Sequence, residues 1–354
     1  MGTRAYREVY REESLPLFQN RVYASPEDAV SCPRGDVVLV ECQETGLVFN
    51  AAFQPEAMVY DAEYQNEQAL SPAFRAHLEF VKDLTKRKMG KSSLVEIGCG
   101  KAYFLEMLQQ VGFGVRGYDP TYEGDNPLVS KRNFTAADGA GASGFILRHV
   151  LEHIASPYQF LRELRDSVSK PTRIYIEVPC FDWIIRHGAW FDIFYEHVNY
   201  FRLSDFHRMF GTVIDSGVSF GGQYLYVVAD LTSLRPPVFD VADSVEIPAS
   251  FSSWKSRPEF DASGSAIVWG GSSKGVIFSL LMQRLGRKIQ FVVDINPEKQ
   301  GKYLPASGLP VVSPETMLMS VEKGSTVFVM NTNYLEEIKM MSSGAFRYVG
   351  VDCG

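Results

Sequence analysis

Two separate blocks of this chain alternate short apolar runs of strand length with longer runs of helical spacing, and this alternation constrains the fold most strongly. The first block starts near Pro72 and the second near residue 260. Strands that alternate with helices form largely parallel sheets with helices on their faces. The sequence therefore predicts two α/β units, joined by a stretch at 232–259 that is rich in Pro, Ser and Asp and lacks a sustained period.

The residues before the first block follow a different pattern. Residues 1 to about 70 are expected to be irregular, apart from two alternating runs at Val37–Glu41 and Gly46–Asn50 that form a hairpin. Because 354 residues exceed what one core usually organises, we expect several domains. The predicted divisions are a small β-rich N-terminal lobe at 1–71, an α/β domain at 72–231, a linker at 232–259 and a second α/β domain at 260–354.

Individual elements of the two blocks are also predicted. Helices are expected from Pro72 and from Pro157, where Ser156 precedes the proline as an N-cap, and a short helix is expected to be capped by Ser313. The predicted strands are SLVEI, GVRGYD, FILRHVL and RIYIEV in the first block, and AIVW, IQFVVD, TVFVM and FRYVGV in the second.

Charge and cysteine usage exclude several classes of protein. The 35 Lys and Arg against 42 Asp and Glu give a net charge of -7, which leaves no basic footprint for nucleic acid. The N-terminal residues are charged where a signal peptide is apolar, and no apolar run reaches the thickness of a bilayer. Five scattered cysteines are typical of reduced thiols. We therefore expect a cytoplasmic protein with no nucleic-acid or membrane partner.

A glycine-rich turn, E-I-G-C-G-K-A at Glu96–Ala102, lies between a predicted strand and a predicted helix. Glycines at this place let the backbone approach a nucleotide-like ligand, and Asp119 at the end of the next strand is placed to accept hydrogen bonds from ribose hydroxyls. Tyr103 stands where a dinucleotide-binding turn needs its third glycine, which argues against NAD. A turn that only joins strand to helix is the structural alternative.

This turn and the acidic strand end resemble motifs I and II of class I S-adenosylmethionine-dependent methyltransferases. The resemblance implies a Rossmann-like methyltransferase sheet and S-adenosylmethionine as cofactor, with S-adenosylhomocysteine as product. The residues expected to contact the cofactor are Glu96, Gly98, Gly100, Tyr103, Asp119, Arg148 and His149.

Five of the six histidines lie between residues 149 and 207, mainly in the segments RHVLEH and YEHVNYF. Histidine exchanges protons near neutral pH, so this clustering indicates chemistry. The H-x-x-E-H pattern of zinc proteases is present, but the segment reads as a strand running into a loop, and no third ligand is evident. Structural roles are expected for His149 as a packed residue, His187 beside Trp190 and His207 on a helix surface.

A longer resemblance extends to the three-domain C-methyltransferases of deoxysugar pathways. It rests on E-x-P, F-D and E-H-x-x-Y-F between residues 177 and 201, and on G-x-x-x-K-G, D-x-x-P-x-K-Q and N-x-x-x-E-I in the last third of the chain. These enzymes methylate carbon beside the ketone of a nucleotide-linked keto-sugar. The resemblance implies that the second Rossmann-like domain helps to shape the pocket of a small-molecule acceptor such as a nucleotide-sugar. The stretch Gly270 to Gly275 with Asp294 is alternatively a second nucleotide site.

Site residues follow from this resemblance and from the chemistry of carbon methylation. We expect His197 to act as a base oriented by Glu196, with His153 and a tyrosine hydroxyl as donors to the enolate oxygen. The tyrosine is Tyr195 or Tyr64, because the family's Y-H-E-H loop is F-Y-E-H in this chain. Single Cys32 and Cys42 replace the paired C-x-x-C motifs of the family's zinc lobe, so no metal is expected.

Three other functions remain open at this point. The first is O- or N-methylation of another natural-product acceptor with the same cofactor. The second is a binding protein that keeps the fold without turnover. The third is an NAD-dependent oxidoreductase, because a second Rossmann-like unit is compatible with dinucleotide binding. The acceptor, the pathway and the oligomeric state are not determined by the sequence.

Overall fold

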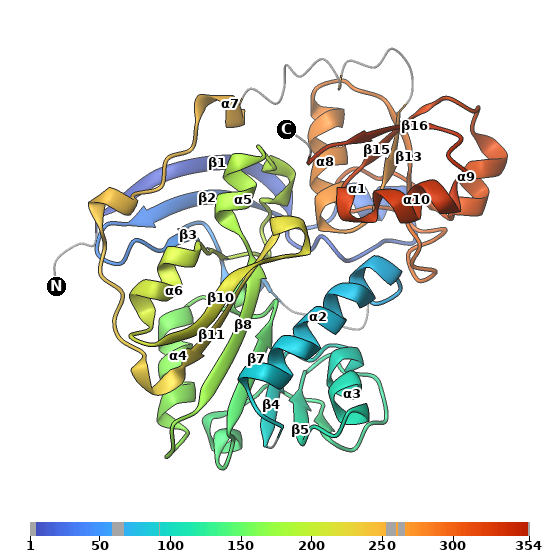
Figure 1. Cartoon of the computed structure of the whole chain (residues 1–354). Coiled ribbons are helices and arrows are strands. Elements are labelled where there is room, and N and C mark those ends of the chain that lie inside the picture. Colours follow the sequence, from blue (N-terminus) through green and yellow to red (C-terminus); the bar gives the residue numbers. More distant parts are fainter. Residues whose placement is uncertain (1–4, 59–66, 92, 253–259, 261–265, 353–354) are drawn as a thin grey trace.

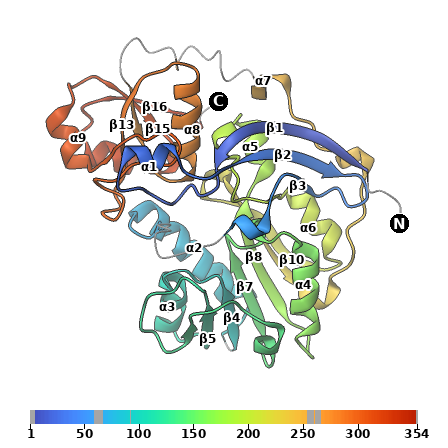
Figure 2. The ribbon, with the colours of Figure 1, turned by 180° about the vertical axis from the view of Figure 1, so that it is seen from behind.

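The computed structural model describes residues 5–58, 67–91, 93–252, 260 and 266–352, and these residues contain three β-sheets (Figure 1). The seven-stranded sheet lies below the other two in this view, and the five-stranded C-terminal sheet lies beside the four-stranded N-terminal sheet. Figure 2 shows the same arrangement from behind. The chain is therefore an α/β structure with an additional β-rich part at its N-terminus.

The largest sheet has the order β10-β11-β8-β7-β4-β5-β6. Its β6, β5, β4, β7 and β8 are parallel, whereas β11 pairs antiparallel with β8 and β10 antiparallel with β11. The strand order reverses between β4 and β7, and open α/β sheets bind ligands at such a point. The strands are β4 (Leu94–Ile97), β5 (Val115–Tyr118), β6 (Val129–Ser130), β7 (Gly144–Arg148), β8 (Arg173–Pro179), β10 (Val213–Ser219) and β11 (Tyr224–Asp230).

Helices cover both faces of this sheet, as a parallel sheet requires. On one face α2 and α3 pack with Leu94 and Ile146, and on the other α4 packs with Phe145 and Ile176. The predicted start of α2 is confirmed, because the Ser71 side chain accepts a hydrogen bond from the amide of Phe74. The helices of this part are α2 (Pro72–Lys88), α3 (Tyr103–Gln110), α4 (Pro157–Asp166), α5 (Phe181–Arg186) and α6 (Leu203–Met209).

The N-terminal sheet contains the predicted hairpin and two strands that the sequence did not predict. β2 (Arg34–Cys42) and β3 (Val48–Asn50) pair antiparallel as expected. β1 (Tyr6–Pro16) was expected to be irregular, and this was wrong, because its mostly exposed, charged residues form an edge strand without the apolar alternation of a buried one. β9 (Asn199–Tyr200) joins from the middle of the chain and pairs with β3.

The segment after β1 packs against the C-terminal unit. Tyr23 and Tyr303 exchange two backbone hydrogen bonds of 2.9 Å, and the amide of Ala306 donates to the carbonyl of Ala29 in α1 (Pro26–Val30) at 2.8 Å. In Figures 1 and 2, α1 accordingly lies beside the C-terminal helices rather than beside β1. The N-terminal residues therefore connect both α/β units.

The C-terminal sheet is parallel and has the order β14-β13-β12-β15-β16. Ser313 caps α9 by accepting from the amide of Thr316, as predicted. The elements are β12 (Ala266–Trp269), α8 (Ser273–Arg284), β13 (Ile289–Val293), β14 (Val311–Val312), α9 (Pro314–Ser320), β15 (Thr326–Val329), α10 (Leu335–Met341) and β16 (Arg347–Gly350). The sequence-derived expectation of a second Rossmann-like α/β unit is confirmed.

Two local predictions need correction. FILRHVL was expected to be a strand throughout, but β7 ends at Arg148, because His149 has φ 53, and a short 3-10 helix follows at Leu151–His153. Ser156 occupies the N-cap position of α4, yet its side chain makes no capping hydrogen bond.

The stretch expected to be a linker contains short helical turns at Val241–Asp243 and α7 (Ala249–Ser252) in its described part. The predicted domain divisions stay a prediction. β9 shows that a strand from within 72–231 belongs to the N-terminal sheet.

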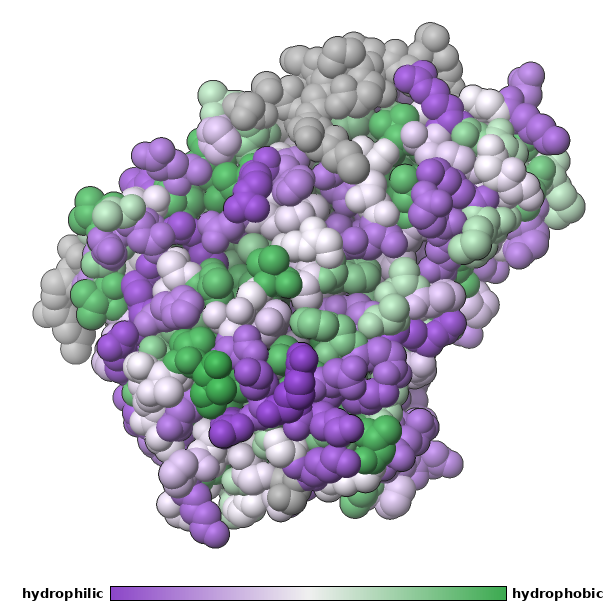
Figure 3. Space-filling model, in the orientation of Figure 1, coloured by the Kyte–Doolittle hydropathy of each residue, from purple (hydrophilic) through white to green (hydrophobic). Residues whose placement is uncertain are grey.

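No helix in the described ranges is long and apolar enough to cross a membrane. On the face shown in Figure 3, hydrophilic residues surround small, separate hydrophobic patches.

Candidate active site

The glycine-rich turn after β4 has a backbone that favours glycine. Gly98 and Gly100 have φ of +71° and +53°. A Cβ at Gly98 would lie 2.4 Å from Cγ2 of Val150, whereas one at Gly100 would meet no described atom within 4 Å. The turn is therefore tightly packed on one side and open at Gly100, where a ligand can approach the backbone.

Two carboxyl groups flank this turn. The Asp119 carboxylate accepts hydrogen bonds of 2.8 Å from the amides of Gly100 and Thr121, which fix it at the end of β5. Burial raises the pKa of Glu96 to about 8, although Arg148 opposes this, so its carboxyl group is mostly protonated at neutral pH. Its Oε2 has no hydrogen-bond partner among the described residues.

Arg148 and His149 continue from β7 on the neighbouring side. The Arg148 guanidinium lies 4.8 Å from the Phe104 ring centre and 3.2 Å from the Glu177 carboxylate. His149 Nδ1 lies 3.3 Å from Glu152 and Nε2 lies 3.4 Å from Glu177, both without the alignment of a hydrogen bond. Burial opposes protonation of His149, but the two carboxylates outweigh it and raise the pKa to about 9.

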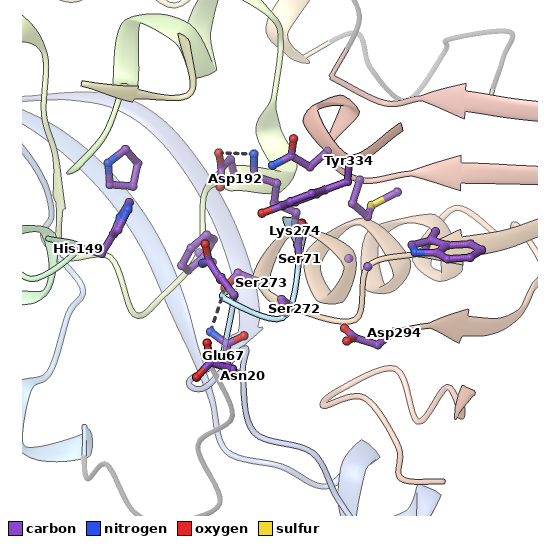
Figure 4. Close-up of a pocket in the computed structure, with 18 of the residues that line it drawn as sticks. Asn20, Glu67, Ser71, His149, Asp192, Ser272, Ser273, Lys274, Asp294 and Tyr334 are labelled. Atoms are coloured by element: carbon purple, nitrogen blue, oxygen red, sulfur yellow. Dashed lines mark hydrogen bonds and ion pairs between the residues drawn. The ribbon is translucent and has the colours of Figure 1, made fainter. Parts of the chain in front are cut away.

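A pocket lies between these strand ends and the C-terminal unit (Figure 4). Asn20 from the N-terminal segment also reaches it. One wall includes His149, Glu152, His153, Glu196 and His197. The other wall includes Ser272, Ser273, Lys274, Asp294 and Tyr334, and Figure 4 shows the first three at the start of α8.

The two histidine-bearing loops meet in this pocket. His153 Nδ1 donates to the carbonyl oxygen of Glu196 at 2.8 Å, and the Val198 amide donates to the carbonyl of Glu152 at 2.9 Å. The rings of His153 and His197 lie edge to face with their centres 5.0 Å apart. The sequence prediction that these loops converge is matched by this placement.

Both imidazoles are neutral at physiological pH. Burial lowers the pKa of His153, with a further contribution from charged His149 and opposition from Glu152. Burial also holds the pKa of His197 well below its ordinary value, and the positive charge on His149 and Lys274 acts in the same direction. A neutral imidazole can accept a proton, which is the chemistry that a general base needs.

Comparison with known protein families identifies the two α/β units. A family model described as a methyltransferase domain matches residues 64–213, and one described as a C-methyltransferase C-terminal domain matches residues 259–350. The chain is a class I S-adenosylmethionine-dependent methyltransferase.

One relative and two solved structures are similar to parts of this chain. The C-methyltransferase NovU of Streptomyces niveus is 24% identical over 285 residues, which is 68% of this chain and 67% of that protein. A putative methyltransferase in complex with the Trm112 activator of Haloferax volcanii has a TM-score of 0.37 and 12% identity, covering 47% of this chain and 92% of that one. Magnesium protoporphyrin IX methyltransferase from Synechocystis PCC 6803, solved with S-adenosylhomocysteine, has a TM-score of 0.35 and 14% identity over 47% and 89% of the chains.

The residues of this methyltransferase fit its cofactor, S-adenosylmethionine. Gly98 and Gly100 give a turn without side chains, Asp119 has acceptor sites left for ribose hydroxyls, and the buried Oε2 of Glu96 is a polar atom that a ligand can use. Tyr103 begins α3 and is 39% exposed, and its contact with the cofactor stays a prediction, as do those of Arg148 and His149.

The predicted tyrosines have different positions. In the methyltransferase the Tyr195 hydroxyl accepts from the Gln54 amide at 2.9 Å, and its ring packs against Phe53, so the hydroxyl is directed to the N-terminal lobe. Phe194 lines the pocket in its place, with its ring centre 4.0 Å from that of His197. Tyr64 lies outside the described residues.

The sequence analysis assigned no role to Lys274, which lies on the far wall of the methyltransferase pocket. Lys274 Nζ lies 3.1 Å from the Asp192 carboxylate and donates to Gln223 at 2.7 Å, which joins the C-terminal unit to the larger sheet (Figure 4). Lys274 belongs to the G-x-x-x-K-G stretch, and Lys299 to the D-x-x-P-x-K-Q stretch, so both lay in recognised motifs without an assigned role.

The other histidines and the cysteines of the described residues do not line the pocket. His207 is exposed on α6 as predicted, but His187 stacks on Trp183 with ring centres 4.7 Å apart, rather than on Trp190. Cys32 and Cys42 are buried thiols, and within the described ranges neither belongs to a cluster of three or more potential metal ligands.

Proposed function

We propose that this methyltransferase transfers the methyl group to a carbon atom beside the carbonyl group of a nucleotide-linked keto-deoxysugar or a similar small molecule. The observation that carries this proposal is the meeting of neutral His153 and His197 with Glu196 in one pocket. Carbon methylation requires a proton to leave that carbon first, whereas O- or N-methylation needs a simpler deprotonation or none. The similarity to C-methyltransferases supports the same choice.

His197 is the proposed base. The sulfonium of the bound cofactor supplies an electrophilic methyl group. The proton leaves the carbon beside the carbonyl and goes to a ring nitrogen of His197, whose neutral state burial maintains. Because the loop of Glu196 is bonded to His153, the same contacts orient His197 next to it.

The hydrogen bond of His153 argues against its expected role as a donor to the enolate oxygen. A carbonyl oxygen only accepts, so Nδ1 of His153 carries the ring proton and Nε2 of the neutral ring has none to donate. His153 therefore suits proton acceptance or relay, and not donation to an enolate oxygen. The positive charge of His149 and Lys274, which line the same pocket, is suited to stabilise the negative charge that develops on that oxygen.

The far wall suits a nucleoside diphosphate. The first turn of α8 faces the pocket, and the side chain of its N-cap residue Ser272 makes no capping bond, which leaves the amides for an anion. Lys299 is 2% exposed and donates to Ser272 Oγ at 2.7 Å and to the carbonyl oxygen of Gly271 at 3.3 Å. Asp294 accepts from the Gly271 amide at 2.8 Å, as Asp119 does from Gly100, which suits a second ribose.

Two measurements test the proposal. With nucleotide-linked keto-deoxysugars and cofactor carrying a ¹³C-methyl group, NMR should show the new methyl bonded to carbon; a methyl on oxygen or nitrogen would establish the alternative activity. In D₂O without cofactor, the enzyme should exchange the acceptor's hydrogen beside the carbonyl, and His197→Asn should lose this exchange while binding S-adenosylmethionine normally. Normal exchange by His197→Asn would refute its role as the base.

A further inference from the structure

We propose that Glu152, His153 and His197 form a binding site for a divalent transition-metal ion of the zinc class, and that the bound ion inhibits the enzyme. One carboxylate oxygen and one ring nitrogen of each histidine lie within 4.8 Å of one another. All three residues line the pocket, so an ion can enter and keep open positions toward it. Two imidazoles and a carboxylate are a ligand set that zinc and related divalent ions bind.

The hydrogen bonds around the three residues favour ligation. His153 Nδ1 donates to the carbonyl of Glu196, which places the lone pair on Nε2. Metal-binding histidines usually donate their other nitrogen in this way, and the contact fixes the ring orientation. Val198 N donates to the carbonyl of Glu152 at 2.9 Å, so the loops that carry the ligands are already joined before any ion binds.

The carboxylate of Glu152 is available to a cation. It is 1% exposed, and neither oxygen accepts an aligned hydrogen bond from a described residue. Its charged neighbour is His149 at 3.3 Å, and His149 has a second carboxylate, Glu177, at 3.4 Å. A metal ion on Glu152 therefore leaves His149 with a counter-ion. Buried charges are expected to be paired or to coordinate metals.

The required movement is small. With zinc–ligand bonds of about 2.0–2.2 Å, the ligand atoms of a tetrahedral site lie roughly 3.4 Å apart. The present atoms, all within 4.8 Å, need to approach one another by at most about 1.4 Å, which side-chain rotation can supply. Water or an oxygen of the acceptor would complete the coordination.

Inhibition follows from the use of the same lone pairs, and this part rests on the proposed function. A nitrogen bound to metal cannot accept a proton, so an occupied site removes both His153 and His197 from acid–base chemistry. The glycine-rich turn contributes no ligand to the cluster, so binding of S-adenosylmethionine should be unaffected.

Metal binding is tested first without acceptor, so that the result does not depend on the reaction. The full-length protein, freed of metal with EDTA, is titrated with Zn²⁺ by calorimetry and with Co²⁺ by visible absorption. We expect one equivalent bound, an affinity loss of at least about tenfold in Glu152→Gln and in His153→Ala, and no change in His207→Ala. Because thiols also bind zinc, a Cys32→Ser/Cys42→Ser protein should retain the site.

Two results would overturn the site. The first is the absence of stoichiometric metal binding. The second is unchanged metal affinity in Glu152→Gln and His153→Ala when both variants have the thermal stability of the wild type.

Activity is measured separately. Zn²⁺ should lower turnover in proportion to occupancy, and EDTA should restore it. Activation by Zn²⁺ would overturn the inhibitory part and assign the ion a catalytic role, whereas metal binding by a protein inactive toward keto-sugars would refute the proposed function alone.

Discussion

His153 Nδ1 and the carbonyl oxygen of Glu196 lie 2.8 Å apart although 43 residues separate them in the sequence. The first residue follows β7 and the second precedes β9, which belongs to the N-terminal sheet. This hydrogen bond therefore connects the methyltransferase sheet to the N-terminal sheet directly at the proposed base. The position of His197 depends on the contacts that hold these two loops together.

Asn199→Ala should lower kcat by about tenfold and leave the Kd for S-adenosylmethionine within about twofold of the wild type. Asn199 Nδ2 donates to the carbonyls of Ile154 at 2.7 Å and Leu151 at 3.3 Å, so its loss loosens the loop beside His197. Steady-state kinetics and calorimetry measure the two quantities. Asn133→Ala, on an exposed residue, is the control and should change neither quantity. A loss of cofactor affinity in Asn199→Ala as large as its loss of kcat would contradict a role in the loop alone.

Gly98→Ala should weaken binding of S-adenosylmethionine by at least about tenfold and destabilise the fold by ~1–3 kcal/mol. The new Cβ would lie 2.4 Å from Val150 Cγ2 on a backbone with φ +71°. Gly112→Ala is a matched control, because Gly112 has φ +83° with no described atom within 4 Å of the added Cβ. It should show the backbone cost without the loss of affinity, as measured by thermal unfolding and calorimetry.

Lys299→Met should raise the KM for a nucleotide-linked acceptor by about 10- to 100-fold, which corresponds to the loss of one charge-assisted hydrogen bond. The buried ammonium group lies beside Ser272 at the start of α8, where we place the diphosphate. Lys288→Met, on an exposed lysine, should leave KM unchanged. If both variants keep the wild-type KM with acceptors that carry and lack the diphosphate, the nucleotide part of the proposal is wrong.

The stability of the protein should fall between about pH 6.5 and pH 9 because of His149. Its pKa is raised to about 9 in the folded protein, so the imidazole binds its proton more tightly in the folded than in the unfolded chain. This stabilisation is complete below pH 6.5 and is lost as the pH rises through 9; the shift corresponds to ~3 kcal/mol. Urea unfolding across this range should show a smaller slope for His149→Gln than for His207→Gln, and equal slopes would disprove the assignment.

Much of the fold could be predicted because each α/β unit is encoded locally. The strands LVEI and AIVW, the helix start at Ser71-Pro72 and the glycine-rich turn with Asp119 are short-range patterns, and each has a physical reason within a few residues. β1 escaped prediction, since an exposed edge strand has no buried face to produce an apolar alternation. Strand β7 was predicted too long, because the left-handed backbone of His149 has no sequence signature.

The sequence alone indicated the class of cofactor and the glycine-rich turn predicted to bind it, because a backbone that must pass close to a ligand needs glycines at fixed positions. Only the tertiary structure decided which side chains share the pocket beside this turn. The Tyr195 hydroxyl is directed away from it, whereas Lys274 and Asp294, which are 79 and 99 positions further along the chain, line it from the C-terminal unit. Which side chains come together in the pocket depends on how the three sheets pack on one another, and that packing is decided by contacts between residues distant in sequence.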